Sequence, residues 1–506
     1  MHIGHSIPVA NAGVLDKSKK KGSIKMFFDN QLQKIKDIIA KGAASAITDK
    51  QFFELEIAKW LCSEKRRWQI EGELYYNYYH DILNRKRTAI GKNGELTEIK
   101  NLPNNKQIDN QYAKMVDQKA NYLLARPISF ESDNEKYNKA LKALFNKQFL
   151  RQIKNGGIDA LNGGITWLHP YYDESGNFKF KRFPSYEILP FWKDDEHMEL
   201  DCAVRLYEVE GYEGTTPVVI KKVEIYRTTG VERYVLQGNT LILDNDNLSS
   251  DYATIDGKGY NWDRVPLVAF KYNYKEIPLI KKVKGLQDAL NIMLSDFMNI
   301  MQEDSRNSIL IIKNYDGTDL GEFRQNLATY GAVKVKAVDG IVGSVEALQI
   351  EVNAGNYEAI TKLLKKAIIE NAMGYDAKDD RLGGNANQMN IKSMYSDIDL
   401  DANNMEAEYQ AAFEQLLWFV NAYLATAGKG NFENEPVTVT FNRDMLMNET
   451  EIIDNLAKLG VRVSNESLIG QLPFVDDVTK ELKKLKEEST ANSEVYNNSF
   501  VNVNDL

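Results

Sequence analysis

Cysteine is scarce in this chain of 506 residues, which contains only Cys62 and Cys202. The two lie far apart in the sequence, so neither a disulfide framework nor a cysteine-based zinc site can be built from them. This usage fits synthesis in a reducing cytoplasm.

Long apolar runs are also missing. The best candidate, LLWFVNAYLATAG from Leu416, is shorter than the roughly 18–20 residues that a membrane span needs. The first residues, MHIGHSIPVANAGVLDKSKKKG, lack the apolar run of a secretory signal. The sequence therefore predicts no membrane partner, and its 43% hydrophobic and 27% charged residues are typical of a globular protein.

Nucleotide-binding motifs are nearly absent, since neither GxxxxGK[ST] nor GxGxxG occurs. One match, His2-Ile3-Gly4-His5, spells the nucleotide-binding signature of class I aminoacyl-tRNA synthetases. That motif works at the start of a helix after a buried strand. No such strand precedes it here and no Gly-rich βαβ unit follows, so we interpret it as a chance match.

Metal-binding patterns are missing too. The other histidines form no HxxxH or HExxH pair: His80, His169 and His197. Two acidic runs, Asp194–Glu196 and Asp397/Asp399/Asp401, are the remaining candidates for a nuclease site. Carboxylates alternating at i, i+2 and i+4 do not share a helix face, which favours a solvated surface. The sequence predicts no catalytic residue, no cofactor and no metal site.

The formal charge of −9 argues against a protein that wraps nucleic acid, because such a protein shows a basic footprint. It does not exclude a surface past which nucleic acid slides. Basic residues cluster in EKRRW from Glu64 and NRKRTAIGK from Asn84. Residues 351–410 hold 6 Lys and Arg against 11 Asp and Glu, so more than half of the negative balance lies there.

Periodicity predicts an α+β fold that is mainly helical. Helical patterns cover residues 51–84 and 110–127, and mostly β patterns cover 165–243, with a hairpin at TWLHPYY-DESGN-FKFKRF. VPLVAFKYN, from Val265, reads as a last buried strand. A helix of unusual length is predicted for 391–427, and the Asn/Ser-rich end, 489–506, is predicted to be disordered.

A heptad pattern appears at residues 281–304. Its apolar residues are spaced 3, 4, 3, 4 and 3, and we call them the apolar seam: Val283, Leu286, Leu290, Met293, Phe297 and Ile300. Asp288, Asn291, Ser295, Asp296 and Asn299 fall on other faces. The seam can pack within its own subunit or against neighbouring copies, and the sequence does not choose between them.

A polar segment of 17 residues, GYDAKDDRLGGNANQMN at 374–390, separates two strongly helical stretches. Connections between helices usually run to about 2–8 residues, and longer ones are commonly functional or disordered. The segment must therefore reach something or be allowed to move.

The order of these features, with several local phrases, resembles the portal proteins, or head-tail connectors, of tailed double-stranded DNA phages of the siphophage type. The phrases are NQYAKMVDQKANYLLARPISFESDN, GGITWLHPYYDESGNFKFKRFPSYEILPFW, VPLVAFKYN and GLQDALNIMLSDFMNIMQED. Each phrase alone is structural, and their order over roughly residues 50–480 carries the resemblance.

The resemblance implies a ring of about twelve copies, a dodecamer, around a DNA channel at one capsid vertex of the virion. It implies the following parts: a lead-in at 1–50, a wing at 51–280, a stem helix at 281–304, a clip at 305–353, a second stem helix at 354–373, a tunnel loop at 374–390, a long helix at 391–427, and a crown at 428–488. The clip strands are expected to pair between neighbouring subunits.

The resemblance also implies partners: double-stranded DNA during packaging and ejection, the terminase large subunit, the major capsid and scaffold proteins, and a head-completion adaptor. The protein would be made in the host bacterial cytoplasm. In the tunnel loop, Lys378 and Arg381 could touch phosphates transiently. Asp376, Asp379 and Asp380 would keep that contact weak, while Gly383 and Gly384 give the backbone freedom.

Two alternatives remain open at this point. One is an enzyme acting on nucleotides or nucleic acid, suggested by the residues at 2–5 and the acidic runs. The other is a structural scaffold protein unrelated to phages, suggested by the lack of any chemical motif.

Overall fold

The computed structural model describes residues 48–90, 94–100, 102–245, 249–255, 257–304, 309–313, parts of 319–348, 354–376, 388–443 and 481–488, with residues 464 and 469. The lead-in, most of the 374–390 segment, most of the predicted crown and the Asn/Ser-rich end lie outside these residues.

The first half begins with helices whose starts are set by capping side chains. Thr48 accepts a hydrogen bond from the Gln51 amide at the start of α2, while the Gln51 side chain accepts one from the Thr48 amide. Gly164, with φ at +81°, ends α6 in the left-handed conformation. The helices are α2 (Asp49–Leu61), α3 (Glu64–Tyr76), α4 (Gln111–Leu124), α5 (Glu135–Leu144) and α6 (Lys147–Gly163).

Two antiparallel sheets follow. The predicted hairpin is β4 (Ile165–Tyr172) with β5 (Phe178–Phe183), and β13 (Val268–Lys271) adds to the other edge of β4. The larger sheet is a meander in the order β10-β9-β8-β7-β6. Its strands are β6 (Ile188–Trp192), β7 (Leu200–Glu213), β8 (Thr216–Arg227), β9 (Gly230–Gln237) and β10 (Thr240–Leu243). Helix α2 packs on this sheet through Phe53, Ile57 and Trp60.

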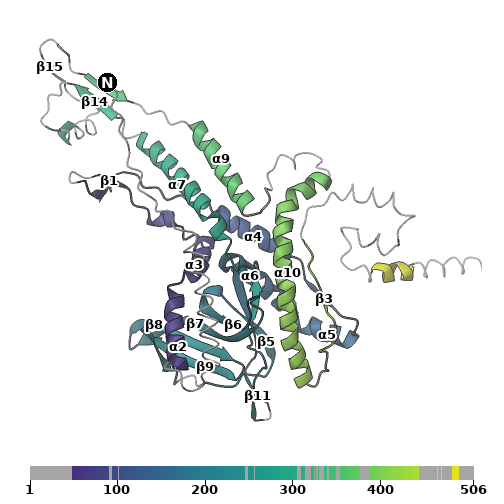
Figure 1. Cartoon of the computed structure of the whole chain (residues 1–506). Helices are drawn as coiled ribbons and strands as arrows, with labels where there is room; N and C mark the ends of the chain where they lie inside the picture. The colour runs from purple at the N-terminus through teal and green to yellow at the C-terminus, as the bar shows by residue number, and fades with distance from the viewer. Residues whose placement is uncertain are drawn as a thin grey trace, which may run out of the picture.

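A pair of helices, α7 (Ile280–Asp304) and α9 (Ala354–Asn371), extends from this body (Figure 1). At the far end of the pair, β14 (Ile309–Lys313) pairs antiparallel with β17 (Ser344–Leu348), and β15 (Ala337–Val338) pairs with β16 (Ile341–Val342). Pairing of β14 with β17 occurs within the chain. Pairing with a neighbouring subunit, as the resemblance implies, would therefore have to use other edges of these strands.

The longest helix, α10 (Gln388–Thr426), runs along the body beside α4 and β13 (Figure 1). It contributes Tyr395, Tyr409 and Phe413 to the main core. Its first residue is Gln388, so the last three residues of the predicted 374–390 loop are helical. After α10, β18 (Thr438–Thr440) returns to pair with β3 (Ser129–Glu131), more than 300 residues earlier.

Two further two-stranded sheets pair β1 (Thr88–Ile90) with β2 (Leu96–Glu98) and β11 (Ala253–Ile255) with β12 (Lys258–Tyr260). The mixed α+β class is confirmed. Among the described residues, no helix is long and apolar enough to cross a membrane.

Candidate functional site

The predicted tunnel loop is described only at its two ends. Asp376 belongs to the described residues, where its side chain is half-buried. The other predicted loop residues lie outside them: Lys378, Asp379, Asp380, Arg381, Gly383 and Gly384. What the structure does describe is residues 373–376, which we call the loop root.

The loop root begins with a capping motif at the C-terminus of α9. The Met373 amide donates to the Glu370 carbonyl at 3.0 Å, and the Gly374 amide donates to the Ile369 carbonyl at 2.9 Å. These are the two bonds of a Schellman motif, in which glycine usually takes the left-handed position. Here Met373 takes it, with φ at +54°. Such a conformation in a non-glycine residue costs energy and persists only where the surroundings hold it.

Helix α4 supplies those surroundings. The Gln118 side chain donates to the Tyr375 carbonyl at 2.8 Å and accepts from the Tyr375 amide at 3.0 Å. Gly374 lies so close that a Cβ there would sit 2.6 Å from Met115 Sδ and 2.9 Å from Gln118 Oε1. The Tyr375 ring packs on Tyr395 of α10, with ring centroids 4.5 Å apart. The loop root is therefore held between α4 and α10.

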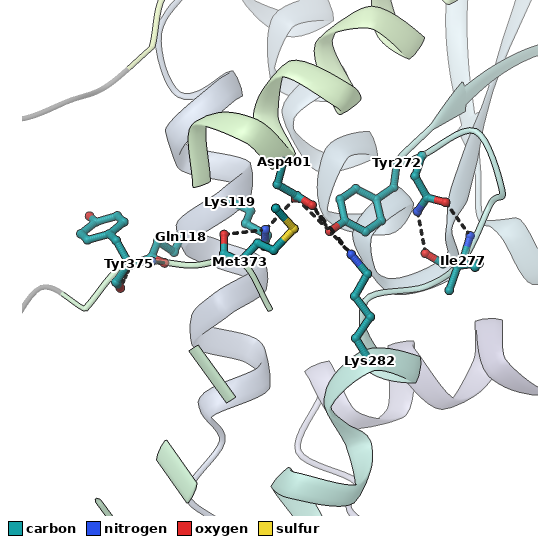
Figure 2. A network of polar contacts seen from close by, with 9 residues as sticks. Gln118, Lys119, Tyr272, Ile277, Lys282, Met373, Tyr375 and Asp401 are labelled. Atoms are coloured by element: carbon teal, nitrogen blue, oxygen red, sulfur yellow. Dashed lines mark hydrogen bonds and ion pairs between the residues drawn. The ribbon is translucent and has the colours of Figure 1, made fainter. Parts of the chain in front are cut away.

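One buried carboxylate, Asp401 of α10, connects the loop root to the rest of the chain (Figure 2). Lys119 Nζ contacts Asp401 Oδ2 at 2.6 Å and donates to the Met373 carbonyl at 3.1 Å. The Tyr272 hydroxyl donates to Asp401 at 2.9 Å, and Lys282 of α7 lies 3.8 Å from its other oxygen. We call Lys119, Tyr272, Lys282 and Asp401 the Asp401 cluster.

In this cluster, burial and the Asp401 carboxylate act in opposite directions on the charge of Lys119. Burial lowers the pKa of Lys119 to about 8, although the Asp401 carboxylate acts in the opposite direction. The Lys119 side chain is only 3% exposed and that of Asp401 9%. A buried pair of this kind adds little net stability, but removing one partner leaves an uncompensated buried charge. The cluster joins α4, α7 and α10 at one buried carboxylate.

The apolar seam of α7 packs within its own subunit. Val283 and Leu290 are buried in the main core, and Leu286 packs against it. Phe297 contacts Tyr357 of α9, with ring centroids 5.0 Å apart. The remaining two seam residues, Met293 and Ile300, are half-buried. This describes the single chain, and whether neighbouring copies also pack on the seam stays a prediction.

Polar residues, unexpectedly, form the most deeply buried stripe of α7. They recur every four residues, and we call them the polar ladder: Gln287, Asn291, Ser295 and Asn299. Each accepts a hydrogen bond from a backbone amide of the segment at 105–112, at distances of 2.7–3.1 Å. Asn105, Gln107 and Asp109 are two residues of extended chain apart, which advance about as far as four residues of helix, so the two repeats match there. The fourth donor, Tyr112, comes three residues later, at the start of α4. The ladder fixes segment 105–112 along α7.

The surfaces of α7 and α9 carry both apolar and paired charged side chains. Five large apolar side chains are exposed: Ile292, Met298, Met301, Ile360 and Leu363. All six lysines of the two helices lie within 4 Å of a carboxylate. On α9, Lys362 contacts Glu358 at 2.6 Å, Lys365 contacts Asp109 at 2.6 Å, and Lys366 contacts Glu370 at 3.8 Å. Within the described chain, these helices present no unpaired lysine.

The histidines have structural contacts. His80 Nε2 donates to the Tyr75 carbonyl and its Nδ1 accepts from Asn291 of the polar ladder. His169 Nδ1 contacts the Pro266 carbonyl at 2.6 Å. His197 Nδ1 contacts Glu276 at 2.7 Å, and Lys65 also pairs with that carboxylate. Although burial opposes it, these two partners lower the pKa of Glu276 to about 2. His2 and His5 lie outside the described residues.

The acidic run of α10 is divided between different partners. Asp399 pairs with Arg443 and accepts from the Tyr122 hydroxyl, whereas Asp401 belongs to its own cluster. Over the described residues, no group of three or more His, Cys, Asp or Glu side chains could hold a metal ion. Neither Asp399 nor Asp401 is therefore placed as a ligand of a shared metal.

The sequence analysis did not identify Gln118 or Lys119, considered Asp401 only as part of an acidic run, and gave the polar ladder no role. A signal for the ladder existed: Gln, Asn, Ser and Asn four residues apart are uncharged, whereas the solvent face of a helix is usually rich in charge. No comparable signal marks Gln118 or Lys119, because their partners lie more than 250 residues away.

Comparison with known proteins gives a consistent result. Residues 59–495 match the family described as phage portal protein, SPP1 Gp6-like. The chain is 28% identical to the portal protein of Bacillus phage SPP1 over 435 residues, which cover 85% of each chain. It is 27% identical to the portal protein of Clostridium phage phiCD119 over 450 residues, 86% of this chain and 96% of that one.

Proposed function

This chain belongs to the SPP1 Gp6-like family of phage portal proteins, and from that premise we propose that about twelve copies close into a ring around a DNA channel at one capsid vertex. The ring is the passage for DNA during packaging and ejection. It docks the terminase large subunit during packaging and a head-completion adaptor afterwards, and it contacts major capsid and scaffold proteins.

Within this proposal each region has a role. Helices α7 and α9 are the stem that lines the channel, and the β14–β17 pair belongs to the clip that faces the motor. Residues 51–280 form the wing, 428–488 the crown, and 374–390 the tunnel loop. In the loop, the charges from Asp376 to Arg381 make weak, transient contacts with DNA, and Gly383 and Gly384 let the backbone move.

The observation that carries the proposal is the pairing of every lysine on α7 and α9 with a carboxylate. Binding to DNA is driven by cations that neutralise phosphates and release counterions. A lysine that already contacts a carboxylate contributes little to that process. A channel wall with paired lysines therefore lets DNA slide without holding it, as a conduit requires.

The exposed apolar residues of the same helices support assembly. Large apolar side chains that remain exposed in a single chain commonly mark contacts with other chains. In this proposal, neighbouring stems pack on the exposed side chains of Ile292 and Met298 of α7 and of Ile360 and Leu363 of α9. Each interface of such a ring is heterologous, so one face of a subunit meets a different face of the next.

A test of the channel wall is to free its lysines. The double variant Glu358→Gln/Glu370→Gln removes the partners of Lys362 and Lys366 and should raise the affinity of the assembled ring for linear DNA. The salt dependence of binding should become steeper, and DNA packaging into capsids should slow. The matched control is Glu208→Gln, which frees Lys221 of β8, 3.8 Å away, on the wing. Equal DNA affinity in the wild type, double variant and control would contradict the channel role of α9.

The two alternatives lose ground for different reasons. The relatives are phage portal proteins, so a scaffold unrelated to phages is no longer supported. The enzyme hypothesis rested on the residues at 2–5 and on the acidic runs. Asp399 and Asp401 are engaged by separate cations and tyrosines, and no observation on the described residues favours chemistry at either run.

A further inference from the structure

We propose that Gln118 and Lys119, two consecutive residues of α4, are positioning residues that fix the loop root and couple it to α10 through Asp401. The proposal rests on the proposed function for the meaning of the loop, but its geometry stands on the described residues alone. It concerns residues 373–376 and their contacts.

Gln118 holds the root by its backbone. Its side-chain amide makes both a donor and an acceptor bond with Tyr375, in the way that a neighbouring strand would. This contact is independent of which side chain occupies position 375. Gly374 allows the approach, because any Cβ would collide with Met115 and Gln118.

Lys119 holds the residue at the turn itself. Its ammonium reaches the Met373 carbonyl, and Met373 is the residue forced into the left-handed conformation. The same ammonium contacts Asp401 of α10. A single nitrogen therefore connects the end of α9 with α10, the helix that resumes the chain after the loop.

The consequence is a mechanical one. Asp401 also receives Tyr272, which follows β13, and lies near Lys282 of α7. A displacement of α7 or α10 that moves Asp401 also moves the Lys119 ammonium, and with it the hydrogen bond from Lys119 to the Met373 carbonyl in the loop root. Figure 2 shows this chain of contacts from Lys282 to Tyr375. Through it, the position of the α7–α9 pair determines where the loop leaves the body.

Hydrogen exchange of the full-length protein tests the proposal. In Gln118→Ala, the amides of 373–376 should exchange about tenfold faster, because two hydrogen bonds to Tyr375 are lost. Gln118→Met keeps a side chain of similar length but makes neither hydrogen bond to Tyr375, so exchange at 373–376 should rise as it does in Gln118→Ala. The control is Lys114→Ala, at an exposed position of the same helix, which should leave the root unchanged.

Coupling is tested by Asp401→Asn, which weakens the hold on Lys119 from the side of α10. Exchange at 373–376 should rise at least threefold, because Asp401 holds the Lys119 ammonium that donates to the Met373 carbonyl. A root unchanged in both Gln118→Ala and Asp401→Asn overturns the proposal. If Gln118→Ala accelerates exchange throughout the chain, Gln118→Met decides by whether 373–376 alone exchanges faster.

These measurements need neither a ring nor DNA. Absence of rings with the predicted exchange pattern would remove the portal role and leave the positioning role standing. Rings with an unperturbed root would do the reverse.

Discussion

The hydrogen bonds of the polar ladder hold segment 105–112 to α7 and so stabilise the fold, and the variant Asn291→Leu tests this. Asn291 is fully buried. It accepts from the Asp109 amide at 3.1 Å and from Gln287 at 3.0 Å, and it donates to His80 Nδ1 at 2.9 Å. Leucine has the same number and branching of side-chain heavy atoms and suits a helix, so the hydrogen bonds are the main loss.

The magnitude follows from the groups left behind. Gln287 keeps a bond to the Asp109 carbonyl, so it retains one partner. The Asp109 amide and the His80 nitrogen lose theirs. An unpaired buried polar group costs about 1–3 kcal/mol, so for these two groups we expect the free energy of unfolding to fall by about 2–6 kcal/mol in total. Segment 105–112 should also lose hydrogen-exchange protection at Gln107 and Asp109.

The assay is urea unfolding of the full-length protein at one fixed concentration, followed by hydrogen exchange under native conditions. Ile292→Ala is the control, since Ile292 is the next residue on the same helix and is 41% exposed. It should change stability by no more than about 0.5 kcal/mol in the unassembled chain. A loss below about 1 kcal/mol for Asn291→Leu would refute the view that the ladder holds the segment to α7.

Two further predictions concern a histidine and a glycine. Burial lowers the pKa of His169 to about 4. The unfolded chain takes up this proton near pH 6.5, so the contribution of His169 to stability is lost as pH falls from 6.5 to 4, by at most about 3 kcal/mol. His169→Asn lacks this titration. The difference in free energy of unfolding between the wild type and His169→Asn, measured in urea, should therefore change between pH 7 and pH 4.5. The same difference at both pH values would contradict a lowered pKa of His169. Gly164→Ala should lower the free energy of unfolding by about 3 kcal/mol or more, because φ is +81° and the new Cβ would sit 2.1 Å from the Glu276 carbonyl oxygen. Thermal unfolding measures this loss. A variant that unfolds at the wild-type temperature would show that the turn relaxes easily.

Local patterns were enough to predict much of the fold. The hairpin of β4 and β5 follows from alternating apolar residues around a DESGN turn, and the meander to β10 follows from the same alternation. Helix α7 was predicted to begin at 281 and begins at Ile280. In these elements the apolar period, the turn residues and the caps all favour the same structure.

Long-range contacts were beyond the sequence. Nothing local indicates that β3 pairs with β18, or that β13 packs against α10. The apolar seam was identified as the packing face of α7, but the most buried stripe is polar because its partner is a backbone segment rather than a helix. Polar side chains are the only ones that can satisfy such a segment.

The candidate site divides in the same way. Composition alone identified 374–390 as unusual, and the roles of its charged residues stay predictions. The residues that hold its root were not predicted, since Gln118 and Lys119 look like ordinary polar positions of an amphipathic helix. Their importance arises from contacts with residues 373–375 and with Asp401, which only the tertiary structure brings together.

The most direct test of the account is the mass and shape of the purified full-length protein, alone and with its capsid scaffold protein. Chains of 57.7 kDa should assemble into rings of about twelve, near 690 kDa, with a central hole in negative-stain images. Light scattering gives the mass independently of the images. Monomers or dimers under both conditions would contradict the proposed channel.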